Sequence, residues 1–119
     1  MRYRRGDVVL VLFPNSDLQT FKRRPALVVQ ADDLRTGLGQ VIVALVTSNL
    51  SRAGHKCRIV VRDGTPEFTA SGLKTDSVLV IDNLSTVRDS YLERTLGTFN
   101  RMDLVDQALA LTFGLKLTS

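Results

Sequence analysis

Short apolar runs, separated by polar and glycine-containing segments, make up most of the chain before residue 82. The run 8–13 has no polar member, which is typical of a strand that is buried on both faces. The polar residues 14–23 follow it and predict a ten-residue loop. Further apolar, β-branched runs predict strands over residues 24–30, 41–47, 56–61 and 77–81.

The pattern is less regular between residues 82 and 98. Residues 82–87 continue the fifth strand irregularly, and residues 88–92 fit one short helical turn. Residues 93–98 fit neither pattern clearly, although Gly97 disfavours a long helix. Residues 63–66 predict a turn, because Asp, Gly and Pro follow one another there.

The end of the chain carries the clearest helical pattern. Asn100 is a good N-cap residue, and Gly114 is a good C-cap residue. Between and just beyond these caps, apolar residues recur on one helical face, and they predict a contact with the core or with a second copy of the chain. The stripe consists of Leu104, Ala108, Leu111 and Leu115, and Val105 and Leu109 widen it. Five or six strands and one terminal helix predict a small, strongly bent sheet or partly open barrel.

Length and composition limit the possible classes of protein. A chain of 119 residues, 44% of them hydrophobic, fits one globular domain over residues 1–119. No apolar run approaches the roughly 18 residues of a membrane span, and no signal-peptide pattern is present, so we expect a cytoplasmic protein. With one histidine, one cysteine (Cys57) and scattered acidic residues, the sequence predicts no disulfide, no metal site and no cofactor.

Charge is distributed unevenly along the chain. The net charge is +4, but residues 1–58 carry a net +6 and residues 59–119 a net −2. A basic N-terminal half predicts a polyanionic partner such as a nucleic acid. The alternative is a solvated basic face without a ligand.

The most informative position in the basic half is Arg24. It ends a cationic segment just before Pro25, where the expected loop meets the expected second strand. Thr47 ends the third strand, so if the two strands pair, Arg24 and Thr47 face one cleft. An arginine can hold two phosphate oxygens in a planar fork. Each of the two residues could also be an ordinary strand-end residue.

An ordered set of short motifs resembles the MazF/PemK toxin family. These motifs are Gly-Asp-Val-Val at 6–9, Pro14, Lys-Arg-Arg-Pro-Ala-Leu-Val at 22–28, Val-Ala-Leu-Val-Thr-Ser at 43–48, the segments 72–77 and 82–87, and the C-terminal amphipathic helix. The resemblance implies a mainly β fold with a C-terminal helix, namely an SH3-like small barrel of five to seven strands. It also implies a homodimer.

The same resemblance implies an activity and partners. The activity is sequence-specific, metal-independent cleavage of single-stranded RNA such as mRNA, and a cognate antitoxin protein neutralises it. The arginine before the proline and the threonine at the end of the third strand are the family's usual catalytic pair, which here are Arg24 and Thr47. The first loop lacks the Gly-x-Glu that several members carry, so the recognised RNA sequence does not carry over.

Several neighbours of the catalytic pair are candidates for RNA contacts. Lys22 and Arg23 are placed to hold phosphates. Phe21 could stack on a base or anchor its loop to the core. The remaining candidates, in the loop after the third strand, are Ser48, Asn49 and Arg52.

The general base is not evident from the sequence. His55 is the single histidine, but its polar neighbours predict an exposed loop, and Asp82 is as well explained by a turn at a strand end. The alternative function is that of a toxin on the same barrel that binds a protein target such as DNA gyrase. Those toxins grip their target through a C-terminal Trp-Gly-Ile, and this chain has no tryptophan. A further alternative is an RNA-binding barrel without catalysis.

Overall fold

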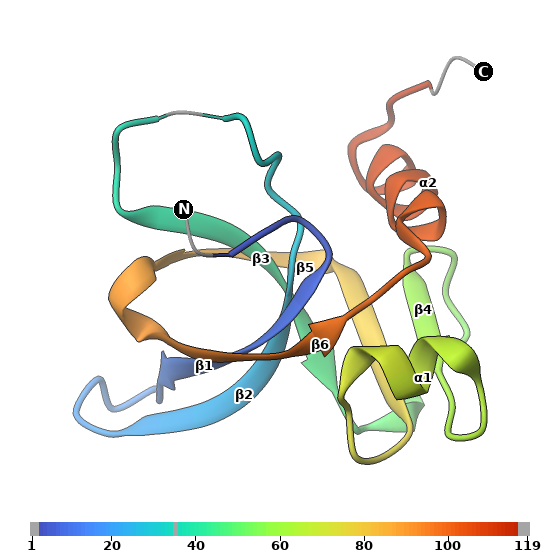
Figure 1. The fold of residues 1–119 in the computed structure, drawn as a ribbon, viewed down its shortest axis with the longest axis horizontal. Coiled ribbons are helices and arrows are strands. Elements are labelled where there is room, and N and C mark those ends of the chain that lie inside the picture. Colours follow the sequence, from blue (N-terminus) through green and yellow to red (C-terminus); the bar gives the residue numbers. More distant parts are fainter. Residues whose placement is uncertain (1–2, 35, 117–119) are drawn as a thin grey trace.

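The structure is a computed structural model that describes residues 3–34 and 36–116. Six antiparallel strands form one strongly bent sheet in the order β4-β5-β3-β2-β1-β6 (Figure 1). The strands are β1 (Asp7–Pro14), β2 (Phe21–Val28), β3 (Gln40–Thr47), β4 (Arg58–Val61), β5 (Ser77–Arg88) and β6 (Leu92–Thr98). The predicted mainly β fold is confirmed, but β4 and β6 are sheet edges in the described part of the chain, so the barrel is not closed.

Four helical segments complete the described chain. Two are α-helices, α1 (Pro66–Ser71) and α2 (Met102–Phe113), and two are single 3-10 turns, η1 (Leu50–Arg52) and η2 (Asp89–Tyr91). The turn predicted over residues 88–92 is confirmed by η2. No helix in the described ranges is long and apolar enough to cross a membrane.

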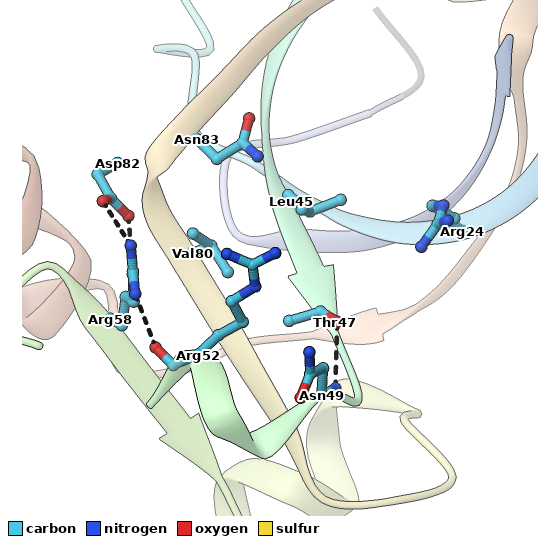
Figure 2. Close-up of a pocket in the computed structure, with 9 residues that line it drawn as sticks. All are labelled: Arg24, Leu45, Thr47, Asn49, Arg52, Arg58, Val80, Asp82 and Asn83. Carbon is cyan, nitrogen blue, oxygen red and sulfur yellow. Dashed lines mark hydrogen bonds and ion pairs between the residues drawn. The ribbon is translucent and has the colours of Figure 1, made fainter. Parts of the chain in front are cut away.

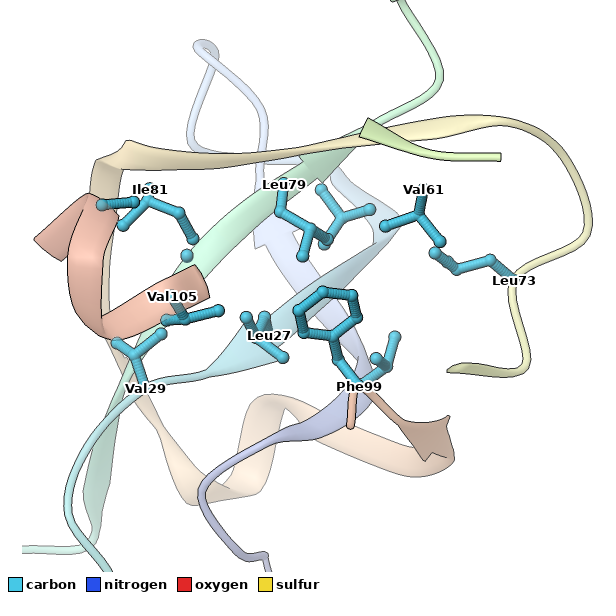
Figure 3. Close-up of a cluster of buried hydrophobic side chains, with 12 residues drawn as sticks. Leu27, Val29, Val61, Leu73, Leu79, Ile81, Phe99 and Val105 are labelled. Atoms are coloured by element: carbon cyan, nitrogen blue, oxygen red, sulfur yellow. The ribbon is translucent and has the colours of Figure 1, made fainter. Parts of the chain in front are cut away.

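Both faces of the sheet are buried, because alternate residues of the central strands belong to two different cores. On one face, Leu27, Val29 and Leu79 belong to one cluster with Phe99 and with Val105 of α2 (Figure 3). On the other face, inside the bend, the core consists of Val9, Val11, Ala26, Val28, Val41, Val43, Val87 and Leu92. A strand with both faces covered needs no polar alternation, which is why the run 8–13 is continuous.

The first loop is shorter than predicted, and this changes the position of Arg24. The Asp17 carboxylate accepts hydrogen bonds from the backbone N–H groups of Gln19 and Thr20, and the Asn15 N–H donates to the Thr20 carbonyl. These bonds close a tight turn, so β1 and β2 stay paired out to Pro14 and Phe21. The loop therefore covers residues 15–20 and not 14–23, and Arg24 lies within β2.

The turn predicted over residues 63–66 forms, with the Thr65 N–H donating to the Arg62 carbonyl, and the helix α1, which the sequence did not predict, follows it. The Thr65 hydroxyl accepts a hydrogen bond from the Phe68 N–H, Pro66 occupies the first helical turn, and Gly72 ends the helix with a left-handed backbone. These are standard start and stop signals for a helix. Residues 93–98, which the sequence left undecided, lie in the edge strand β6.

The C-terminal helix forms as expected, but its details differ from the prediction. It begins at Met102 after Arg101, not with a side-chain cap from Asn100, and it ends at Gly114 as predicted. Its buried residues are Val105, Ala108 and Ala110, whereas Leu111 and Leu115 are 55% and 64% exposed. The predicted core contact is confirmed for Val105 and Ala108, whereas Leu111 and Leu115 lie outside the core. Their contact with a second copy of the chain stays a prediction.

Candidate active site

A polar pocket of about 540 Å³ opens where β3, β4 and β5 meet η1. Leu45 and Val80 form an apolar part of its wall, and polar or charged side chains form the rest (Figure 2). These polar residues are Arg24, Thr47, Asn49, Arg52, Arg58, Asp82 and Asn83. We call this cavity the polar pocket.

A second cavity of about 430 Å³, which we call the basic pocket, lies among β1, β2, β6 and the segment 72–77. Its apolar lining residues are Leu10, Pro25, Val46, Leu73 and Leu96. Its cationic lining residues are Lys22, Arg23, Arg24, Lys74 and Arg94. An apolar surface surrounded by cations suits a nucleobase together with its flanking phosphates.

Arg24 and Thr47 are the two residues common to both pockets. The β2–β3 ladder explains why. Its last pair is Ala26 with Leu45, and two further residues in the same register would have placed Arg24 opposite Thr47. Because the strands separate before that point, the two side chains border a gap that the pockets share. The expectation that both face one cleft is confirmed.

Hydrogen bonds set the orientation of Thr47 and its loop. The Thr47 Oγ1 accepts a hydrogen bond of 3.1 Å from the Asn49 N–H (Figure 2). The Asn49 Oδ1 in turn accepts from the N–H and the hydroxyl of Ser51, which caps η1. The hydroxyl hydrogen of Thr47 therefore remains available to a ligand.

A three-element clasp stiffens the polar pocket. Arg58 of β4 donates from Nε and Nη2 to the two oxygens of Asp82 on β5, at 3.2 and 3.1 Å. Its Nη1 donates to the Arg52 carbonyl in η1. The hydrogen bond with Arg58 lowers the pKa of Asp82, and Asp82 raises the pKa of Arg58. Arg58 thus favours the ionised form of Asp82, and a carboxylate with a lowered pKa is a weak base.

The cationic residues predicted from the sequence differ in whether they are already paired with an acidic residue. Arg23 is paired with Glu93 of β6, with 2.8 Å between Nε and Oε2. For Arg24, Lys22 and the guanidinium of Arg52, no hydrogen bond or ion pair to the described residues 3–34 and 36–116 is found. Arg24 therefore remains free to hold an anion.

The other predicted contact residues divide between the pockets. Lys22, Arg23 and Ser48 line the basic pocket, and Asn49 and Arg52 line the polar pocket. Phe21 lines neither of the two. It packs edge-on against Tyr91, with ring centroids 5.7 Å apart, and stays half-exposed.

His55 lies outside both pockets. It is exposed, and its Nδ1 accepts a hydrogen bond from the Cys57 N–H in the turn before β4. Cys57, two residues further on, is buried.

The polar and charged lining residues that were missing from the predicted site are Arg58, Asn83, Lys74, Thr75, Ser77 and Arg94. Lys74 lies in the segment 72–77, which carried part of the family resemblance, so a signal existed for it. Arg94 lies in an edge strand without an evident pattern, and it reaches the pocket only because β6 pairs with β1.

Comparison with known proteins agrees with this architecture. The family model described as PemK-like, MazF-like toxin of type II toxin-antitoxin system matches residues 4–113. A protein from Mycolicibacterium smegmatis named probable endoribonuclease MazF is 32% identical over 114 residues, which cover 94% of this chain and 97% of that protein.

Solved structures give the same result for the fold. The Mycobacterium tuberculosis toxin MazF-mt6 superposes with a TM-score of 0.73 at 23% identity, over 93% of this chain and 99% of that one. A mycobacterial endoribonuclease solved with its cognate antitoxin gives a TM-score of 0.73 at 19% identity, over 98% and 99% of the two chains. With the family model spanning nearly the whole chain, this protein belongs to the PemK-like, MazF-like toxins of type II toxin-antitoxin systems.

Proposed function

We propose that this protein is a toxin that cleaves single-stranded RNA at specific sequences by attack of the 2′-hydroxyl, without a metal ion. The observation that carries the proposal is the position of Arg24 and Thr47, which border both pockets at once. A chain of RNA that occupies both pockets has one phosphate at that border. The name of the Mycolicibacterium smegmatis relative, probable endoribonuclease MazF, supports the nuclease over the gyrase-binding alternative.

The proposed reaction is a transfer of the phosphate to its own ribose. The 2′-oxygen bonds to phosphorus while the bond from phosphorus to the 5′-oxygen breaks. The proton of the 2′-hydroxyl is removed, and the leaving 5′-oxygen is protonated. The products are a 2′,3′-cyclic phosphate and a 5′-hydroxyl.

Arg24 is the group best suited to the charge that develops on the phosphate. Its guanidinium stays protonated and can donate two parallel hydrogen bonds to the non-bridging oxygens. Thr47 is suited to orientation, because its oxygen already accepts from Asn49 and its hydrogen can bond the 2′-oxygen or the phosphate. Asp82 is poorly suited as the base, since Arg58 lowers its pKa.

An antitoxin is the second proposed partner, and a second copy of the chain is the third. A mycobacterial neighbour was solved with its cognate antitoxin, and an acidic, partly unfolded antitoxin segment would compete with RNA for the cations of the basic pocket. The exposed α2 residues Leu111 and Phe113 support self-association of the toxin. Size-exclusion chromatography with light scattering tests the homodimer, which a monomer at micromolar concentration would contradict.

The test of the proposed function is incubation with a long RNA of known sequence. Discrete fragments with 2′,3′-cyclic phosphate and 5′-hydroxyl ends are expected. A 2′-deoxy substitution at one cleavage site should abolish cleavage there and leave binding largely intact. Fragments with 3′-hydroxyl ends would contradict the mechanism, and intact RNA would favour the protein-binding toxin.

A further inference from the structure

The two pockets that meet at Arg24 and Thr47 differ in chemistry. The basic pocket offers an apolar surface and cations on flexible stems, which bind any base face and any phosphate. The polar pocket offers amide groups and a fixed ion pair, which can distinguish the hydrogen-bonding edges of bases. We propose that the polar pocket binds one nucleobase beside the scissile phosphate, and that Asn83 determines which base is accepted. This inference rests on the proposed cleavage of RNA.

The position of Asn83 follows from an irregularity in β5. Ala44 and Leu45 are consecutive in β3, but their partners on β5 are Leu84 and Val80. Three residues of β5, Ile81 to Asn83, therefore have no partner on β3. Such a bulge turns side chains away from the ladder, and bulges are frequent beside active sites. Here it turns Asp82 and Asn83 into the wall of the polar pocket (Figure 2).

The two bulge residues before Asn83 are anchored, and Leu84 after it pairs with Ala44, so the backbone of Asn83 is held from both sides. Ile81 is fully buried, and its N–H donates to the Cys57 carbonyl at 3.0 Å. Asp82 is clasped by Arg58, which also holds the η1 backbone. A reading group on a rigid support loses little freedom when it binds, and this favours selectivity.

The amide of Asn83 is free to bind a ligand. It is exposed, and no hydrogen bond joins its side chain to any residue in the described ranges 3–34 and 36–116. By contrast, the Asn49 oxygen is already occupied by Ser51. The Asn83 amide therefore presents one donor and one acceptor side by side, which matches a base edge that carries an acceptor next to a donor.

The test compares cleavage of an RNA pool with a randomised segment by the wild type and by Asn83 variants, with fragment ends sequenced. A bidentate amide contact discriminates between bases by roughly five- to 160-fold. Asn83→Ala should therefore flatten the preference at a single position next to the cut by about that factor. Preferences at the other positions should remain.

Asn83→Asp provides a sharper variant, because it keeps the shape and replaces the donor by an acceptor. It should shift the preference at the same position towards bases that present an exocyclic amino group, such as cytosine. Asn100→Ala is the matched control, since it removes an exposed amide outside both pockets, and its profile should equal that of the wild type. Circular dichroism of each variant confirms that it is folded.

A second pool with 2′-deoxy residues separates base reading from cleavage. The sequences from this pool that bind the wild type are compared with those that bind each variant. An Asn83-dependent preference in this bound pool supports base reading even if RNA is not cleaved, in which case only the proposed function fails. If RNA is cleaved but Asn83→Ala leaves both profiles unchanged, or flattens every position equally, the inference is overturned while the nuclease stands. An absence of any base preference in either pool also overturns it.

Discussion

Arg24 and Thr47 occupy positions that would pair with each other if the β2–β3 ladder continued beyond Ala26 and Leu45. The ladder stops there, and beyond it the two strands are no longer joined by backbone hydrogen bonds. The gap between them is bordered by the Arg24 guanidinium and the Thr47 hydroxyl. Each side chain is carried by a strand whose other end is buried in both cores, so the pair is mounted on a rigid part of the molecule.

Removing the guanidinium should abolish most of the activity. Arg24→Ala is expected to lower the rate of RNA cleavage by about 10²–10³, because it removes a donor matched to the charge of the transition state. Thr47→Ala should lower it less. Arg24→Lys should restore little, since an ammonium cannot form the planar fork. Single-turnover cleavage of a fluorescent oligonucleotide measures all three.

The matched control for Arg24 is Arg88→Ala, which removes an exposed arginine outside both pockets. It should cleave like the wild type. Thermal unfolding of the two active-site variants should change little, because neither side chain belongs to a core. A fully active Arg24→Ala protein would exclude Arg24 from the chemistry.

Cleavage should survive EDTA. Asp82 is the one carboxylate among the described residues that line the two pockets, and both of its oxygens accept hydrogen bonds from Arg58. The site therefore lacks the free oxygen ligands that Mg²⁺ requires. Loss of activity in EDTA, restored by added Mg²⁺, would refute this prediction.

Binding of RNA should depend strongly on salt. If about four of the lysines and arginines lining the pockets contact phosphates, the plot of log affinity against log salt for an uncleavable strand has a slope of roughly −3. Lys74→Ala should reduce the magnitude of this slope by about 0.7, since one contact is lost. Arg101→Ala, which removes a cation just before α2 and outside both pockets, should leave it unchanged. A slope near zero would exclude these pockets as the RNA surface.

The clasp between Arg58 and Asp82 should make stability depend on pH in the acid range. The pKa of Asp82 is lowered from 3.8 in the folded protein, so below that value the unfolded chain binds more protons than the folded one. The stabilisation is complete above the unfolded pKa and is lost as the pH falls through the folded one. Urea midpoints between about pH 6 and pH 2.5 measure the effect.

Asp82→Asn should flatten this acid limb, because asparagine does not titrate. Asp33→Asn is the control, since Asp33 is exposed and has no ion pair within the described residues. An identical acid limb in Asp82→Asn and the wild type would show that the clasp contributes nothing to stability.

Two glycines should be essential for attaching α1 to the sheet. A Cβ at Gly72 would lie 2.1 Å from the Leu96 carbonyl oxygen, and one at Gly97 would lie 2.3 Å from the Ala70 carbonyl oxygen. Gly72→Ala should therefore cost about 1–3 kcal/mol of unfolding free energy through overpacking, in addition to backbone strain.

Gly54→Ala separates the two contributions to that cost. Gly54 also has a positive φ, of 85°, but nothing lies within 4 Å of the added Cβ. Its cost should be limited to the left-handed backbone, about 1–2 kcal/mol. Equal losses for Gly72→Ala and Gly54→Ala in chemical denaturation would argue against the close approach of α1 and β6.

The sequence by itself determined the features that depend on neighbouring residues. The continuous run 8–13 predicted a strand buried on both faces, and Gly114 predicted the end of α2. The order of the motifs indicated the toxin family, and with it Arg24 and Thr47. Runs and caps act within a few residues, so they can be recognised without knowledge of the fold.

Only the tertiary structure decided what lies around that pair. Arg94 reaches the basic pocket because β6 pairs with β1, and Asn83 reaches the polar pocket because three residues of β5 have no partner on β3. The face of α2 that is buried likewise depends on where the sheet meets the helix. Strand pairing, bulges and helix docking result from contacts between residues far apart in the chain, and the local pattern around each residue does not contain them.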